Sequence, residues 1–219
     1  SIPESIIWAL TVALSNHVTL LLPITEIYFQ QNVITQVASI ILMDGIILLS
    51  IIAFFLELST KQNVNLFNFI KNLFLNPFIL SIIIGLLFLL LNFNIDQTPI
   101  EYTLSKLAAC VSPVGLFAIG IILSFYTKNV INKLSVSISV LKLVISPIIL
   151  LLIGLVIFNA GLPAEIPGAF FVSVAPCGVT SIVLCAAYNV SPENIIKAIF
   201  VSTIASIGTI FFAIKYLTL

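Results

Sequence analysis

Seven mainly apolar runs, each about 20 or more residues long, follow one another along the chain, and a helix of that length spans the roughly 30 Å core of a bilayer. Backbone groups in lipid must be satisfied within their own segment, and these runs are about twice as long as the strands of a membrane barrel. They therefore predict membrane-spanning helices. The predicted spans are residues 6–29, 33–56, 74–93, 104–125, 134–158, 166–188 and 195–217.

Composition excludes a water-soluble globular protein. Hydrophobic residues make up 61% of the chain and charged residues 7%, whereas soluble domains contain about 25% charged residues. The predicted fold class is an all-α integral membrane protein with seven transmembrane helices, embedded in a lipid bilayer. Eight lysines, no arginine and a formal net charge of zero leave no basic patch, so nucleic acid is not expected as a partner.

The sequence carries no familiar catalytic or cofactor motif. It lacks His-Glu-x-x-His, Gly-x-Ser-x-Gly and a nucleotide-binding glycine loop, so neither an enzyme nor a cofactor is expected. The three cysteines lie in apolar runs without the spacing of metal ligands, and the hydroxyl residues of the last span share one face, so both groups are interpreted as packing residues. They are Cys110, Cys177 and Cys185, and Ser202, Ser206 and Thr209.

Lysine placement predicts the orientation of the bundle, because short cytoplasmic loops are enriched in Lys and Arg. The loops after the second, fourth and sixth spans hold most of the lysines, whereas the opposite side holds Lys106 and Lys215. The lysines of the first group are Lys61, Lys71, Lys128, Lys133 and Lys197. We therefore expect the N-terminus of this chain in the cytoplasm and its C-terminus outside.

Two of the seven spans contain polar and helix-breaking residues near mid-membrane. The first span carries Asn16, His17 and Pro23, and the sixth carries Pro176-Cys177-Gly178 followed by Thr180. Proline removes a backbone donor, and broken backbone at membrane depth is tolerated where it lines a protein interior or a cavity. Two interrupted segments in corresponding places of two halves are typical of the midplane binding site of a secondary transporter. Val18-Thr19 and Val179-Thr180 would be equivalent positions of such a repeat.

Three ionisable side chains lie within predicted spans. Asp44 is costly at bilayer depth, so it is a candidate for ion or proton coupling, with a packing role as the alternative. His17 is either a group that changes charge near neutral pH or an imidazole bonded to a neighbouring carbonyl. Lys142 could pair with Asp44 or with an anion, but snorkelling toward the cytoplasmic surface is the favoured interpretation.

Five short motifs follow one another along the spans. They are Ser15-Asn16-His17 with Pro23, Asn76-Pro77 with Gly85, Ser112-Pro113 with Gly115 and Gly120, Lys142 with Ser146-Pro147, and Ala175-Pro176 with Tyr188. Their order and spacing resemble the auxin efflux carrier family, which includes bacterial permeases of the malonate type. Each motif alone is weak, but together they cover nearly the whole chain and are fairly specific.

The resemblance implies a transporter of ten helices in two inverted repeats, with its fourth and ninth helices broken and crossing at the substrate site. This chain would correspond to helices four to ten and would lack the first three, and its start at Ser1 fits a fragment or a processed product. Residues 1–58 would be the last two helices of a truncated first repeat, residues 59–73 a cytoplasmic linker, and residues 74–219 a complete second repeat. The chain departs from the family at His17, where small residues are more common, and at Asp44-Gly45, where amides are common.

The sequence thus predicts a secondary active transporter that moves a small organic anion, such as a carboxylate, across a bacterial inner membrane by alternating access. The expected substrate-binding residues are Asn16, His17, Pro23, Pro176, Cys177, Gly178 and Thr180, and the expected ion-coupling residues are Asp44 and Lys142. The coupling ion would be a proton or sodium. A non-transporting remnant, a scaffold or a sensor stays open as an alternative, as does a homodimer, but a retinal sensor would need a lysine in the middle of the last span.

Cysteine labelling tests the predicted orientation. With the native cysteines replaced, Asn129→Cys should be shielded from a membrane-impermeant reagent in intact cells, because it lies on the lysine-rich side. Glu165→Cys should react. Labelling of position 129 without labelling of position 165 would reverse the orientation.

Overall fold

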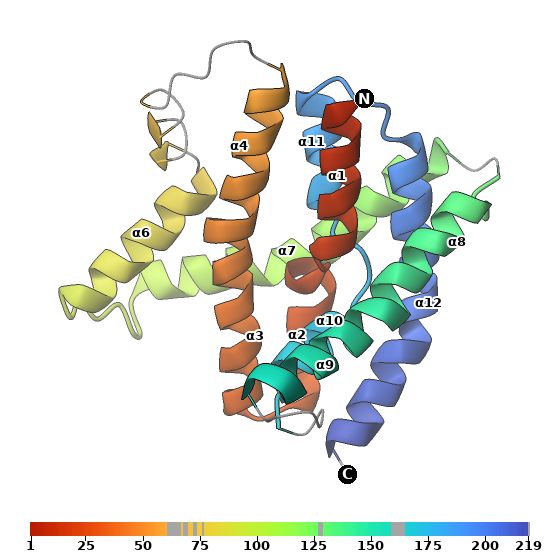
Figure 1. Ribbon diagram of the computed structural model, residues 1–219. Coiled ribbons are helices and arrows are strands. Elements are labelled where there is room, and N and C mark those ends of the chain that lie inside the picture. Colours follow the sequence, from red (N-terminus) through yellow and green to blue (C-terminus); the bar gives the residue numbers. More distant parts are fainter. Residues whose placement is uncertain are drawn as a thin grey trace.

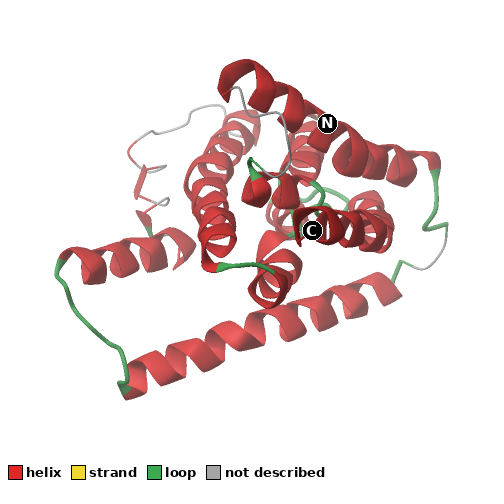
Figure 2. Cartoon of the chain, turned by 90° about the horizontal axis from the view of Figure 1, so that it is seen from below, coloured by secondary structure: helices red, strands yellow, loops and turns green. Residues whose placement is uncertain are grey.

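The computed structural model describes residues 1–60, 67, 70–71, 74–75, 77–126, 129–158 and 165–218. Every regular element within these ranges is a helix (Figure 2). The all-α prediction is therefore confirmed. Most of the predicted linker at residues 59–73, together with Lys61, Asn76, Lys128 and the loop at residues 159–164, lies outside the described residues.

Four helical stretches are long and apolar enough to cross a membrane, and they correspond to the second, fourth, fifth and seventh predicted spans. The second span consists of α3 (Gln31–Met43), η2 (Asp44–Leu48) and α4 (Leu49–Thr60). The fourth is α7 (Pro99–Ser124), and the seventh is α12 (Glu193–Thr218). The fifth consists of α8 (Lys133–Val140), η3 (Leu141–Ile145) and α9 (Ser146–Phe158). The labels η1 to η3 denote single π-helical turns.

The other three predicted spans are shorter or interrupted. The first is divided into α1 (Ile2–Ala13), η1 (His17–Leu21) and α2 (Leu22–Tyr28), and the sixth into α10 (Pro167–Ser173) and α11 (Thr180–Ala187). The third contains α6 (Pro77–Leu90), whose 14 residues extend about 21 Å at the usual rise. That is less than the roughly 30 Å of a bilayer core, so a crossing by these three segments stays a prediction.

The helices form a bundle with the chain termini at opposite ends (Figure 1). The first residues of α1, the end of α4 and the link between α11 and α12 lie at one end, and the last turn of α12 lies at the other (Figure 1). Helix α6 lies outside α4, and no residue of α7 is buried (Figure 1).

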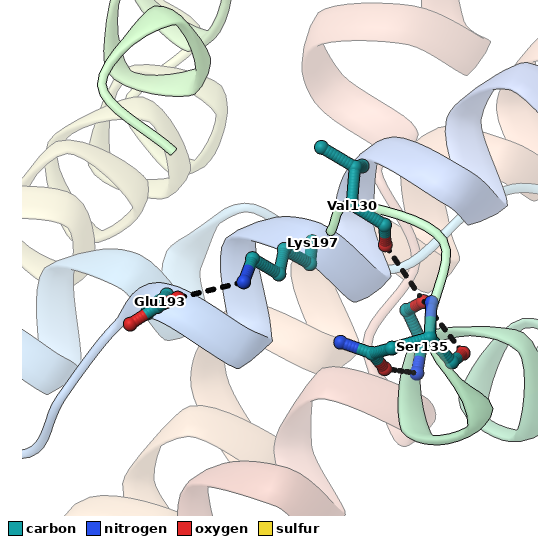
Figure 3. A network of polar contacts seen from close by, with 5 residues as sticks. Val130, Ser135, Glu193 and Lys197 are labelled. Atoms are coloured by element: carbon teal, nitrogen blue, oxygen red, sulfur yellow. Dashed lines mark hydrogen bonds and ion pairs between the residues drawn. The ribbon is translucent and has the colours of Figure 1, made fainter. Parts of the chain in front are cut away.

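Helices α8 and α12 pack side by side, with their first turns at the same end of the bundle (Figures 1 and 3). The Ser135 hydroxyl donates a hydrogen bond to the Val130 carbonyl (2.9 Å), which fixes the start of α8. Nearby, the Lys197 ammonium contacts the Glu193 carboxylate at 2.6 Å (Figure 3). Lys197 therefore belongs to α12 and is buried there, so its assignment to the preceding loop was wrong.

Buried apolar side chains form two clusters, one on each side of the interrupted segments. The first joins α1 and α4 to α11 and α12, through residues such as Ile7, Leu56 and Ile199. The second joins η1 and α3 to α10 and α12, through residues such as Leu21 and Phe171. Each half of the first span therefore packs on one half of the sixth, and the break in the sixth span contributes Cys177 to the first cluster and Val174 and Ala175 to the second.

Candidate functional site

Both predicted interruptions are present. Helix α1 ends at Ala13, Leu14 is extended, and helical structure resumes at His17. In the sixth span, residues 174–179 separate α10 from α11. The polar and proline-containing stretches identified in the sequence are therefore the places where the helices break.

The two breaks cross each other through their backbones. The Asn16 N–H donates to the Pro176 carbonyl (2.9 Å), and the Gly178 N–H donates to the Leu14 carbonyl (2.8 Å). Ser15 and Cys177 thereby face each other as one antiparallel β-bridge. The crossing of two broken helices that the family resemblance implies is therefore present between the first and sixth spans, with Asn16 and Pro176 on facing segments.

Gly178 lies where the two broken segments are in close contact. A Cβ atom on this residue would lie 2.9 Å from Leu14 Cδ2 and from Leu14 Cγ. Such a distance is shorter than real Cβ contacts, so a larger residue would push the two segments apart. Gly178 thus permits the crossing, which is a structural reason for its presence beside any contact with a substrate.

Hydroxyl groups form hydrogen bonds with backbone groups at and beside the breaks. The Ser15 hydroxyl donates to the Val172 carbonyl (2.9 Å), and the Thr209 hydroxyl donates to the Val174 carbonyl (2.8 Å). The Ser202 hydroxyl accepts from the Cys177 N–H at 3.2 Å. The interpretation of Ser202 and Thr209 as packing residues is confirmed, with the addition that they hold the broken sixth span on α12. Ser206 bonds within its own helix.

Pro23 leaves the carbonyl of Thr19 without the N–H donor that a regular α-helix would supply. In a regular α-helix the residue at position 23 would donate its N–H to the carbonyl of Thr19, but proline has no N–H. The hydroxyl of Ser112 on α7 donates to that carbonyl instead, at 2.5 Å. Gly115, one turn further along α7, allows this approach, since a Cβ there would lie 2.8 Å from Thr19 Cγ2. Pro23 therefore helps to join α7 to the first span.

Lys142 points into the protein, so the snorkelling interpretation was wrong. Its side chain is 2% exposed, and its ammonium donates to the carbonyl of Ala13 at 3.1 Å. Ala13 is the last residue of α1, where unpaired carbonyls and the helix dipole favour a cation. Lys142 also interacts electrostatically with Asp44 and Cys177.

His17 and Asp44 form a direct pair. Nε2 of His17 lies 3.0 Å from Oδ2 of Asp44, and the two side chains are 8% and 25% exposed. The interpretation of His17 as an imidazole bonded to a neighbouring carbonyl was therefore wrong. Two residues that the sequence assigned separately, one to the substrate site and one to ion coupling, belong to one contact.

Each of the three ionisable residues lies in a π-helical turn. His17 is the first residue of η1, Asp44 is the first of η2, and Lys142 is the second of η3. Such turns are rare and occur often at functional sites, because the extra residue displaces side chains from their regular helical positions. Sequence analysis did not predict them; a charged residue within an apolar run is the signal that coincides with them here.

Asn16 brings a free hydrogen-bond donor to the crossing. Its Oδ1 accepts from the Thr19 hydroxyl, while its buried Nδ2 has no partner among the described residues. Thr180 is the first residue of α11 and is partly exposed. A groove of about 610 Å³ beside the broken sixth span is lined by Leu143, Val174 and Thr209 among others, but not by Asn16, His17 or Lys142.

The predicted site residues therefore divide into two groups. Most of them come together at the crossing, where they form the backbone bridge or a contact with a charged neighbour. These are Asn16, His17, Asp44, Lys142, Pro176, Cys177 and Gly178. Pro23 and Thr180 lie in the first turns of α2 and α11 and shape the helix starts.

Gly178→Ala should weaken the crossing, because the added methyl group would overlap Leu14. We expect a loss of about 1–3 kcal/mol in stability, the usual cost of overpacking. Thermal unfolding of the detergent-solubilised protein measures it. Gly85→Ala is the matched control, since a Cβ on Gly85 meets nothing within 4 Å. Equal unfolding temperatures for the two variants would contradict the close approach.

Comparison with known families agrees with the geometry. The model of the family described as membrane transport proteins matches residues 2–214, which include both broken spans. Comparison with curated proteins gave no match. The chain therefore belongs to the membrane transport protein family, the auxin efflux carrier family that its motifs resemble.

Proposed function

We propose that this membrane transport protein is a secondary active transporter for a small organic anion, and that the anion binds at the crossing of the two broken spans. The observation that carries the proposal is the buried Asn16 amide, whose Nδ2 has no partner among the described residues. A buried donor without a partner costs free energy, and an anionic ligand oxygen would satisfy it.

Charge around the crossing supports an anion. Lys142 places a buried ammonium at the end of α1, close to Cys177 of the other broken span. Helix α11 begins at Thr180, and the N-terminal end of a helix favours negative charge. A carboxylate would accept hydrogen bonds from the Asn16 amide and from the ammonium, and bonds to charged groups are the stronger kind.

The proposed mechanism is alternating access. Among the described residues, two backbone hydrogen bonds join the two breaks directly, and each half-span contributes to a different apolar cluster. One repeat would move against the other about the crossing of the two broken spans. Asp44 would couple this movement to an ion gradient.

The family resemblance supplies the wider scheme of this proposal. All seven predicted spans would cross a bacterial inner membrane, residues 1–58 would end a first repeat, and residues 74–219 would form an inverted second repeat joined to it by the linker at residues 59–73. The first residues of α1 would face the cytoplasm. The lysine distribution supports this orientation.

Uptake by the full-length protein in liposomes tests the function. Radiolabelled mono- and dicarboxylates should be accumulated when a proton or sodium gradient is imposed. Asn16→Ala should raise the concentration needed for half-maximal uptake by about 10-fold or more, since a hydrogen bond to a charged group contributes about 1.5–3 kcal/mol. Asn194→Ala, an exposed change at the start of α12, is the control and should behave as wild type. Absence of uptake for every anion and gradient would refute the proposed function.

A further inference from the structure

We propose that the His17–Asp44 pair and Lys142 form one coupling centre, which takes up one proton together with one singly charged anion. The inference rests on the proposed function. It names the coupling ion, the residues that carry it and the charge of the substrate.

The contact between His17 and Asp44 defines where the proton goes. An ionised carboxylate only accepts hydrogen bonds, so at the 3.0 Å contact Nε2 carries a hydrogen and donates it to Oδ2. A proton arriving from water then binds Nδ1 and produces an imidazolium ion. The contact to Asp44 is kept and strengthened, while the charge of the pair changes from minus one to zero.

The same contact favours a proton over sodium. Hard cations are bound by several oxygen ligands from carboxylates, carbonyls or water. Here Oδ2 of Asp44 is in contact with a ring nitrogen, which in this pair is a donor and offers no lone pair to a metal. The Asp44 side chain is 25% exposed, so the pair is not fully enclosed by protein.

Lys142 links the proton to the anion. Before protonation, the negative charge of Asp44 offsets the positive charge of Lys142, and the two interact electrostatically. After protonation, the pair is neutral and the buried ammonium has no counter-charge. An unpaired buried charge is costly, so one negative charge near Ala13 and Asn16 becomes favourable. By linkage, the bound anion favours protonation to the same extent.

Other ionisable groups near the pair are poorly placed to perform this exchange. The elements packed against η1 and η2 are α2, α3, α4, α6 and α7, of which α3 and α6 carry no ionisable side chain. The ionisable residues on the other three are not buried in the described structure, whereas His17 is. They are Glu26, Tyr28, Glu57, Glu101, Tyr102, Lys106 and Cys110.

The charge count gives a measurable stoichiometry. One proton and one monoanion together carry no net charge, so a voltage should neither drive nor oppose their movement. In liposomes containing the wild-type protein, an inwardly directed proton gradient of one pH unit should support about tenfold accumulation of a radiolabelled monocarboxylate. One pH unit is a tenfold ratio of proton concentrations, and each anion moves with one proton. A potassium diffusion potential without a pH gradient should support none.

Substitutions test which residues are responsible for the response of uptake to the pH gradient. His17→Gln and Asp44→Asn should each lower the ratio of uptake with the pH gradient to uptake without it, by about fivefold or more, the lower end of usual coupling. Lys142→Met should weaken binding of the monocarboxylate at every pH. The matched controls are Asp96→Asn and Lys106→Met, which change the same residue types at exposed positions and should keep the wild-type ratio.

The wild-type measurement does not depend on whether any variant folds. Accumulation driven by voltage or by sodium, or a wild-type response to pH in well-expressed His17→Gln protein, would overturn this inference while leaving anion transport intact. Failure of the wild-type protein to move any anion, even by exchange, would refute the proposed function and the inference together.

Discussion

Backbone hydrogen bonding at membrane depth is the constraint on which the rest of this structure depends. Two helices are broken where lipid could not satisfy their free N–H and C=O groups, so the breaks must satisfy each other. They do so through the paired bonds of Asn16 with Pro176 and of Gly178 with Leu14. Further backbone groups at or near the breaks form hydrogen bonds with the hydroxyls of Ser15, Ser112, Ser202 and Thr209. The crossing therefore requires α7 and α12 beside it, and their positions follow from it.

The same breaks determine where charge can be placed. The end of α1 presents a carbonyl that Lys142 occupies, and the restart at His17 begins with a π-helical turn that meets the turn at Asp44. Buried ionisable groups are costly unless they are paired. Within the described part of the chain, His17 and Asp44 contact each other and Lys142 contacts a helix end, whereas the buried Asn16 Nδ2 and the Ser181 hydroxyl have no hydrogen-bond partner. A transporter needs such a site: stable enough to persist, but incomplete without its ligand.

Much of the fold could be predicted from sequence because its signals are local. Length and apolarity located the long helices, and Asn16, Pro23, Pro176 and Gly178 located both breaks, since proline, glycine and amides act within one or two turns. The environment of Lys142 could not be predicted in this way. A π-helical turn inside the fifth span turns its side chain toward α1, whereas position along the helix suggested the surface. The His17–Asp44 contact depends on how η1 packs against the second span, which no local pattern encodes.

Cross-linking of Ser15 to Cys177 tests the crossing most directly. Their bonding pattern makes them a non-hydrogen-bonded antiparallel pair, for which Cα atoms lie about 4.5 Å apart, a separation that a disulfide can span. With Cys110 and Cys185 replaced by serine, Ser15→Cys should form an intramolecular disulfide with Cys177 on mild oxidation, identified as a linked peptide by mass spectrometry. Ser5→Cys, in the first turns of α1, should not. Free thiols at positions 15 and 177 after oxidation, in folded protein, would contradict the crossing.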